Sequence, residues 1–175
     1  EAELVGHDTP DAALTVYSRG LNVLPDDTRL IYARALHYAN SGRTADAERD
    51  LRHVLELKPG DVDAMNALGY TLADANQKLD EAYSLIQVAI KAKPEEPAVI
   101  DSLGWVQYRR GNLAEAETAL RRAYEKQPDA EIASHLGEVL WHRGNKDEAK
   151  TILEAGRKKD AKNKSLLDTL KRLGL

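Results

Sequence analysis

The chain has 175 residues, with 25 Lys and Arg against 29 Asp and Glu, a formal net charge of −4 and no cysteine. This length suits one domain, and the charge disfavours a nucleic-acid-binding protein, which usually carries a basic face. The lack of cysteine excludes disulfides, thiol catalysis and thiolate metal sites. Because 25 Ala and 24 Leu make strong helix formers dominant, the composition predicts an all-α fold.

The N-terminal segment is expected to be half of a helical hairpin. Glu1–Val5 is typical of the end of a helix rather than of a secretion signal. A lone helix is predicted from about Pro10 to Leu24, so that residues 1–27 form a half-repeat. We therefore expect the sequence to be a fragment whose earlier repeats lie upstream.

Proline recurs through the rest of the chain at a nearly constant interval. The positions, 34, 35 and 34 residues apart, are Pro25, Pro59, Pro94 and Pro128. A period near 34 is typical of stacked helical hairpins. The same register holds for Leu-Gly pairs at 68–69, 103–104 and 136–137, and for Ala47, Ala82, Ala116 and Ala149. Three independent markers therefore indicate one repeat.

Each interval contains two amphipathic stretches of about 13 residues, separated by a turn signal such as Arg110-Gly111-Asn112. Every unit is thus predicted to be a helix, a tight turn and a second helix. The expected units are Thr28–Asp61, Val62–Glu96, Pro97–Asp129 and Ala130–Asn163. A final amphipathic helix, Ser165–Leu173, is expected to cap the last unit with its leucine face.

These markers resemble the tetratricopeptide repeat (TPR) family. One whole unit matches the family pattern at Leu103-Gly104, Gly111, Ala116, Leu120, Ala123 and Pro128. The resemblance implies a right-handed superhelical solenoid of helix-turn-helix hairpins, a single all-α domain over residues 1–175. Two places depart from the pattern. The turn Asn76-Gln77-Lys78-Leu79 has one extra residue, and Ala161 stands where proline is expected.

The sequence contains none of the common catalytic or cofactor-binding signatures. His135 and His142 are seven residues apart and share a helix face, but a third ligand would be needed for a metal site. We expect these two histidines to be solvated or to face a partner. Acidic pairs such as Asp80-Glu81 begin second helices, where their charge stabilises the helix N-terminus. The chain is therefore predicted to have no enzyme activity, cofactor or metal.

First helices of successive units should line a concave groove, as in repeat solenoids. The residues expected to bind a partner there are Asn66, Tyr70, Asp101, Trp105, Tyr108, Arg109, Trp141 and His142. Aromatic rings interleaved with polar groups suit an extended peptide or an exposed partner helix. Trp105 and Tyr108 are expected to anchor that partner, the alternative being that the rings pack between hairpins. A related family uses lysine, asparagine and arginine at these positions to bind the C-terminal carboxylate of a chaperone. The groove positions here have no lysine, which disfavours that mode of binding.

Three longer runs, at 66–74, 101–105 and 131–141, resemble a narrower group of proteobacterial outer-membrane repeat lipoproteins. This resemblance implies a non-enzymatic adaptor that joins a periplasmic carboxyl-terminal processing protease to its peptidoglycan hydrolase substrates. It also implies a location on the periplasmic side of the outer membrane, through a lipid anchor outside this fragment. The alternatives are a cytoplasmic scaffold, a secretion or pilus assembly factor, and the recruiting arm of a larger enzyme.

Overall fold

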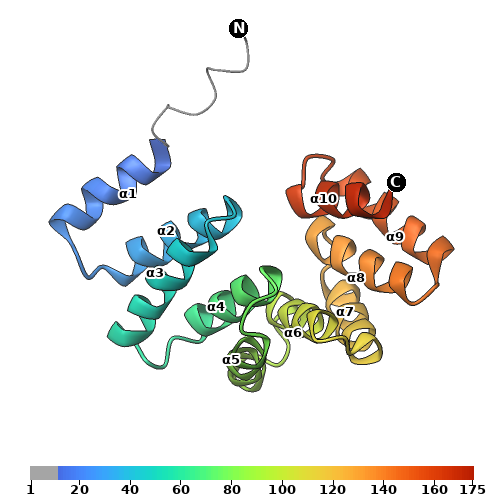
Figure 1. Ribbon diagram of the computed structural model, residues 1–175, viewed down its shortest axis with the longest axis horizontal. Coiled ribbons are helices and arrows are strands. Elements are labelled where there is room, and N and C mark those ends of the chain that lie inside the picture. Colours follow the sequence, from blue (N-terminus) through green and yellow to red (C-terminus); the bar gives the residue numbers. More distant parts are fainter. Residues whose placement is uncertain (1–11) are drawn as a thin grey trace, which may run out of the picture.

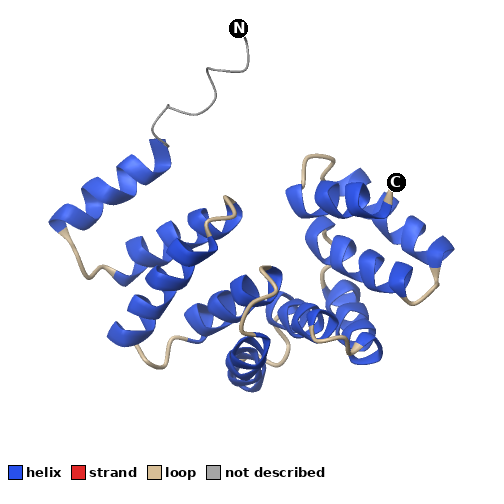
Figure 2. Ribbon diagram, viewed as in Figure 1, coloured by secondary structure: helices blue, strands red, loops and turns tan. Residues whose placement is uncertain are grey.

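The computed structural model describes residues 12–175, and all regular structure in this part is α-helical (Figures 1 and 2). The helices are α1 (Ala12–Val23), α2 (Thr28–Asn40), α3 (Thr44–Leu57), α4 (Val62–Asp74), α5 (Leu79–Ala92), α6 (Pro97–Arg109), α7 (Leu113–Lys126), α8 (Ala130–His142), α9 (Lys146–Lys159) and α10 (Lys164–Leu173). Successive hairpins follow a curved path with α1 and α10 at its ends. The predicted all-α solenoid is confirmed.

Two helices fall within each expected unit, and α2, α4, α6 and α8 start at the first residue of their units. The lone helix α1 is described from Ala12 onward, and none of its described side chains is buried; its expected start, Pro10, lies outside the described residues. The segment Glu1–Val5 lies outside the described residues. The capping helix begins one residue early, at Lys164, because the Asn163 side chain accepts a hydrogen bond from the Leu166 N–H at 3.0 Å.

Local signals set where the first helices begin and end. The side chains of Asp27, Asp61 and Asp129 cap α2, α4 and α8 by accepting backbone N–H groups, which typically stabilises a helix by about 1 kcal/mol. Glycine with positive φ follows three of the first helices, at Gly42, Gly111 and Gly144. In the second unit Asn76 stands at the position of this glycine and also has a positive φ, and Lys78, just before α5, has a positive φ as well.

Small residues bring the two helices of each hairpin close together. A Cβ added to Gly104 would lie 2.5 Å from Cγ of Leu120 and 3.2 Å from the carbonyl oxygen of Ala116. Gly69 faces Ile86 and Gly137 faces Leu153 in the same way. The repeated alanines of the second helices are also fully buried. The recurring Leu-Gly and Ala markers are therefore the contact points inside the hairpins.

The last hairpin is covered by α10. Leu166 is fully buried beside Ala130 and Leu153, with Leu170 and Leu173 packed against the same cluster. The leucine face thus covers apolar side chains of the hairpin α8–α9 that would otherwise be exposed. Across residues 12–175, every helix is too short or too polar to span a lipid bilayer.

Replacing Ala116 with Leu is expected to lower the free energy of unfolding by about 1–3 kcal/mol, because the added carbons have no space between α6 and α7. Urea unfolding monitored by circular dichroism measures this change. The matched control is Ala114→Leu, since Ala114 is exposed on the same helix. Equal stability of the two variants would contradict the packing described here.

Candidate functional site: the concave groove

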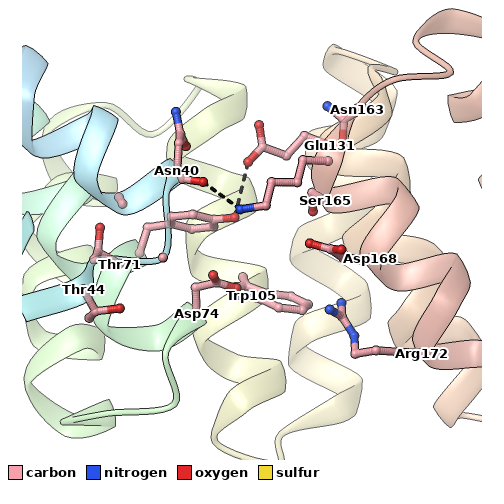
Figure 3. Close-up of a pocket in the computed structure, with 14 residues that line it drawn as sticks. Asn40, Thr44, Thr71, Asp74, Trp105, Glu131, Asn163, Ser165, Asp168 and Arg172 are labelled. Carbon is pink, nitrogen blue, oxygen red and sulfur yellow. Dashed lines mark hydrogen bonds between the residues drawn. The ribbon is translucent and has the colours of Figure 1, made fainter. Parts of the chain in front are cut away.

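Two adjoining pockets lie on the inner side of the curve and together form what we call the concave groove. The larger measures about 480 Å³ and lies between the α2–α3 turn and α10, over α4, α6 and α8 (Figure 3). The smaller measures about 400 Å³ and extends along α2, α4 and α6. The residues that line both pockets are Ala39, Asn40, Tyr70, Thr71 and Glu131. An extended chain can therefore contact both pockets.

The structure brings half of the eight predicted partner-binding residues to this groove. Asn66, Tyr70, Asp101 and Trp105 line one or both pockets. The Asn66 Oδ1 atom is buried and accepts no hydrogen bond in the described part of the chain. The residues outside the lining of these pockets, near the C-terminal ends of α6 and α8, are Tyr108, Arg109, Trp141 and His142.

Trp105 lies in the floor of the larger pocket but is only 2 % exposed. Its ring stacks on His135 with centroids 4.2 Å apart, and its Nε1 donates to Oδ1 of Asp74 at 3.2 Å. The ring therefore packs between hairpins, which was the alternative to an exposed anchor. Truncating a Trp buried in this way typically costs about 3–5 kcal/mol of stability, so a Trp105→Ala variant would report on folding more than on binding.

His135 is buried, with 1 % of its surface exposed, whereas the sequence led us to expect a solvated or partner-facing side chain. Its Nδ1 lies 2.9 Å from each carboxylate oxygen of Asp101, and its Nε2 lies 3.3 Å from the hydroxyl of Tyr70. The imidazole thus links α8 to α6 and α4. The spacing of His135 and His142 on one helix gives no sign of this pairing. A signal was nevertheless present, because Asp101 stands one repeat away and carries the opposite charge.

The electrostatics of this cluster favour a charged imidazole. Burial alone lowers the pKa of His135, but the negative charge of Asp101, the hydrogen bond to it, and Glu131 and Asp74 together raise it above the usual value. A protonated ring donates from both nitrogens. It can therefore donate to Asp101 and to the Tyr70 hydroxyl, which in turn donates to Oε1 of Glu131 at 3.3 Å.

Burial within the groove shifts the pKa values of the two groups next to this imidazole, Tyr70 and Glu131. Burial is the main reason why the pKa of Tyr70 lies well above its usual value, and the charge of Glu131 raises it further. Burial also raises the pKa of Glu131, although His135 opposes this. Tyr70 is therefore a neutral hydroxyl that donates and accepts hydrogen bonds, and it is poorly suited to act as a nucleophile.

A second polar cluster joins α6, α8 and α10 beside the groove. The Tyr108 hydroxyl lies 3.1 Å from Oε1 of Glu138 and 3.0 Å from Nδ1 of His142. Glu138 is buried and accepts hydrogen bonds from Arg172 at 2.6 Å and from Thr169 at 3.1 Å. Burial raises the pKa of Glu138, but the Arg172 guanidinium and the hydrogen bonds from Tyr108 and Thr169 together hold that pKa below its usual value. Burial, helped by Glu138, raises the pKa of Tyr108 to about 12.

Arg109 and Trp141 each pair with a neighbouring side chain through a cation–π contact. The guanidinium of Arg109 lies 5.7 Å from the Trp105 ring centroid, and the ammonium of Lys146 lies 5.0 Å from that of Trp141.

Among residues 12–175, no three His, Asp or Glu side chains are placed to hold a metal ion. The groove thus offers amide, hydroxyl and carboxylate groups on a rigid helical surface, an arrangement suited to binding.

Comparison with known proteins agrees with this architecture. The sequence profile of the tetratricopeptide repeat family matches residues 32–97 and 102–163. The chain belongs to the tetratricopeptide repeat family. The TPR repeat-containing protein PA4667 of Pseudomonas aeruginosa PAO1 is 43 % identical over 136 residues, which cover 77 % of this chain. The chain spans only 23 % of the length of that relative.

Solved structures share the fold. The crystal structure of TTC0263, a thermophilic TPR protein of Thermus thermophilus, matches with a TM-score of 0.78 and 24 % identity, over 94 % of this chain and 91 % of that one. An O-GlcNAc transferase mutant of Thermobaculum terrenum matches with a TM-score of 0.64 and 23 % identity, over 75 % of this chain and 26 % of that one. At these identities the likeness shows the fold and not an activity. TPR folds typically serve as protein-interaction scaffolds, which fits the groove.

The pH dependence of stability tests the His135 cluster. An unfolded histidine has a pKa near 6.5, and the folded pKa of His135 is raised. Its contribution to stability is therefore complete below about pH 6.5 and is lost as pH rises through the folded value. Urea unfolding between about pH 5.5 and 8.5 should show this loss in the wild type and not in His135→Gln.

The control for this experiment is His142→Gln, which leaves the Asp101–His135 pair intact and should keep the wild-type dependence on pH. If the free energy of unfolding depends on pH in the same way for the wild type and for His135→Gln, the buried imidazole does not gain a proton in the folded state.

Proposed function

We propose that this chain is a non-catalytic interaction module that binds an extended segment of a partner protein in the concave groove. The observation that carries the proposal is the pair of adjoining pockets, about 480 and 400 Å³, that share Asn40, Tyr70 and Glu131. Pockets of this size hold several side chains. A continuous groove with polar groups at its centre suits a segment whose successive side chains enter different pockets.

The groove also has an apolar wall, which supplies contact area. Tyr32 and Leu36 of α2 line the smaller pocket, as does the polar side chain of Asn66. Leu36 is 37 % exposed, although it is an aliphatic side chain. Burying such a side chain under a partner is favourable, because apolar surface leaves water, and the Nδ2 group of Asn66 supplies N–H donors for a backbone carbonyl.

We further propose that the partners are a periplasmic carboxyl-terminal processing protease and its peptidoglycan hydrolase substrates, with the chain acting as the adaptor between them. Its support is the resemblance of the runs at 66–74, 101–105 and 131–141 to outer-membrane repeat lipoproteins. The similarity to a much longer Pseudomonas repeat protein fits this proposal. The location would then be the periplasmic side of the outer membrane, reached through a lipid anchor outside this sequence.

The groove is tested by Leu36→Glu, which places a charge on its apolar wall. Binding to the processing protease or to a hydrolase should weaken about 30-fold, which corresponds to about 2 kcal/mol for an interface hot spot. Fluorescence anisotropy with the labelled partner measures the affinity, and a thermal melt checks that the variant folds.

The matched control is Val88→Glu, because Val88 is 48 % exposed on α5 and lines neither pocket. It should bind like the wild type. If Leu36→Glu also binds like the wild type, the groove is not the interface. If the wild type binds neither protein but co-purifies with cytoplasmic, secretion or pilus proteins, or with a larger enzyme, the adaptor proposal is wrong and the corresponding alternative replaces it.

A further inference from the structure

One side chain of the capping helix reaches across the groove to the first repeat. Lys164, the first residue of α10, donates from Nζ to the backbone oxygen of Asn40, the last residue of α2, at 2.7 Å. The two residues are 124 positions apart in the chain. They stand on opposite walls of the larger pocket, where Asn40 lies on one side and Ser165 and Asp168 lie on the other (Figure 3). We call this hydrogen bond the cross-groove contact.

The cross-groove contact is isolated and easily broken. Lys164 is exposed, and its acceptor is a neutral carbonyl in a solvated groove. No Cα atoms of α2 and α10 come within 8 Å of each other, so the backbones of these helices do not reinforce it. A long lysine side chain also loses rotamer entropy when it is held in one position. The contact therefore contributes little to stability, and a bound group can replace it.

The charges around Lys164 favour a cation at this place. Asp74, Glu131 and Asp168 all line the larger pocket, whereas its cations are Lys164 and Arg172. Arg172 is already bound to the buried carboxylate of Glu138 at 2.6 Å. The ammonium of Lys164 thus occupies a carboxylate-rich pocket in which its hydrogen bond goes to a carbonyl. A second cation would be attracted to the same pocket.

We propose that Lys164 is an internal occupant of the concave groove and that a lysine or arginine side chain of the bound segment replaces it. This inference rests on the proposed function, and it names the chemistry of the partner. The incoming cation takes over the carbonyl of Asn40 and the attraction of the groove carboxylates, and the cross-groove contact opens. The free chain is then partly autoinhibited, and the groove selects extended segments that carry a basic residue.

The first test compares the wild type with Lys164→Met, which keeps most of the side-chain length and removes the charge. The probe is a pool of 12-residue peptides in which one central position is fixed as Lys, Arg, norleucine, citrulline or Glu and the other positions vary. Peptides captured by the immobilised 175-residue chain are quantified by mass spectrometry. The control is Lys162→Met, an exposed lysine outside the pocket lining.

The wild type should capture the Lys and Arg pools about threefold or more over the norleucine and citrulline pools. Lys164→Met should raise capture of the basic pools about three- to tenfold, by removing both the competitor and the repulsion, while Lys162→Met should match the wild type. Equal capture of basic and neutral pools, or no effect of Lys164→Met, overturns this inference and leaves the proposed function standing. If the wild type captures no pool above the background of the matrix without protein, the proposed function fails, and the inference with it.

The second test observes the cross-groove contact directly. Because the chain has no native cysteine, spin labels can be attached to Ser41→Cys and Leu167→Cys, both exposed positions on the two sides of the groove. Double electron–electron resonance should give a distance distribution that broadens in Lys164→Met and, in the wild type, on addition of the Lys pool. A distribution that changes in neither case overturns the proposed opening of the contact, whatever the capture experiment shows.

Discussion

The close approach of two helices within each hairpin is the constraint on which the rest of this structure depends. Gly69, Gly104 and Gly137 leave no room for a Cβ against Ile86, Leu120 and Leu153, respectively. A larger side chain would push the second helix outward and change how one hairpin stacks on the next. The groove is formed by the first helices of stacked hairpins. The positions of its walls therefore depend on the contacts between first and second helices, which lie on the side of the first helices that faces away from the groove.

Buried polar contacts also join successive helices along the groove. Asp101 and His135 link the first helices of the third and fourth repeats, and Glu138 and Arg172 link the fourth repeat to the capping helix α10. A buried charge is costly unless it is paired and hydrogen-bonded, and both pairs meet that condition. They hold the groove floor in one arrangement, which reduces the loss of side-chain entropy when a partner binds.

The repeat could be predicted from sequence because its physical cause recurs. The Leu-Gly pairs and the alanines stand at every hairpin contact, so their spacing predicted both the helices and the stacking. The sequence carries no comparable signal for how deeply a residue of the groove is buried. Counting positions predicted that Trp105 lines the groove, and His135 was expected to be solvated or to face a partner, but the burial of both depends on side chains of neighbouring repeats that cover them. The contact between Lys164 and Asn40 occurs once, across 124 residues, and leaves no periodic trace in the sequence.

Within residues 12–175, the helices α1 and α10 are attached to the rest of the array in different ways. None of the described side chains of α1 is buried, whereas α10 is attached through buried Leu166 and through Arg172. A helix without buried side chains separates from its neighbours at a lower free-energy cost than a helix held by buried contacts. Tension transmitted through α1 would therefore separate α1 from α2 before it disturbed the helices α4, α6 and α8 that form the floor of the groove.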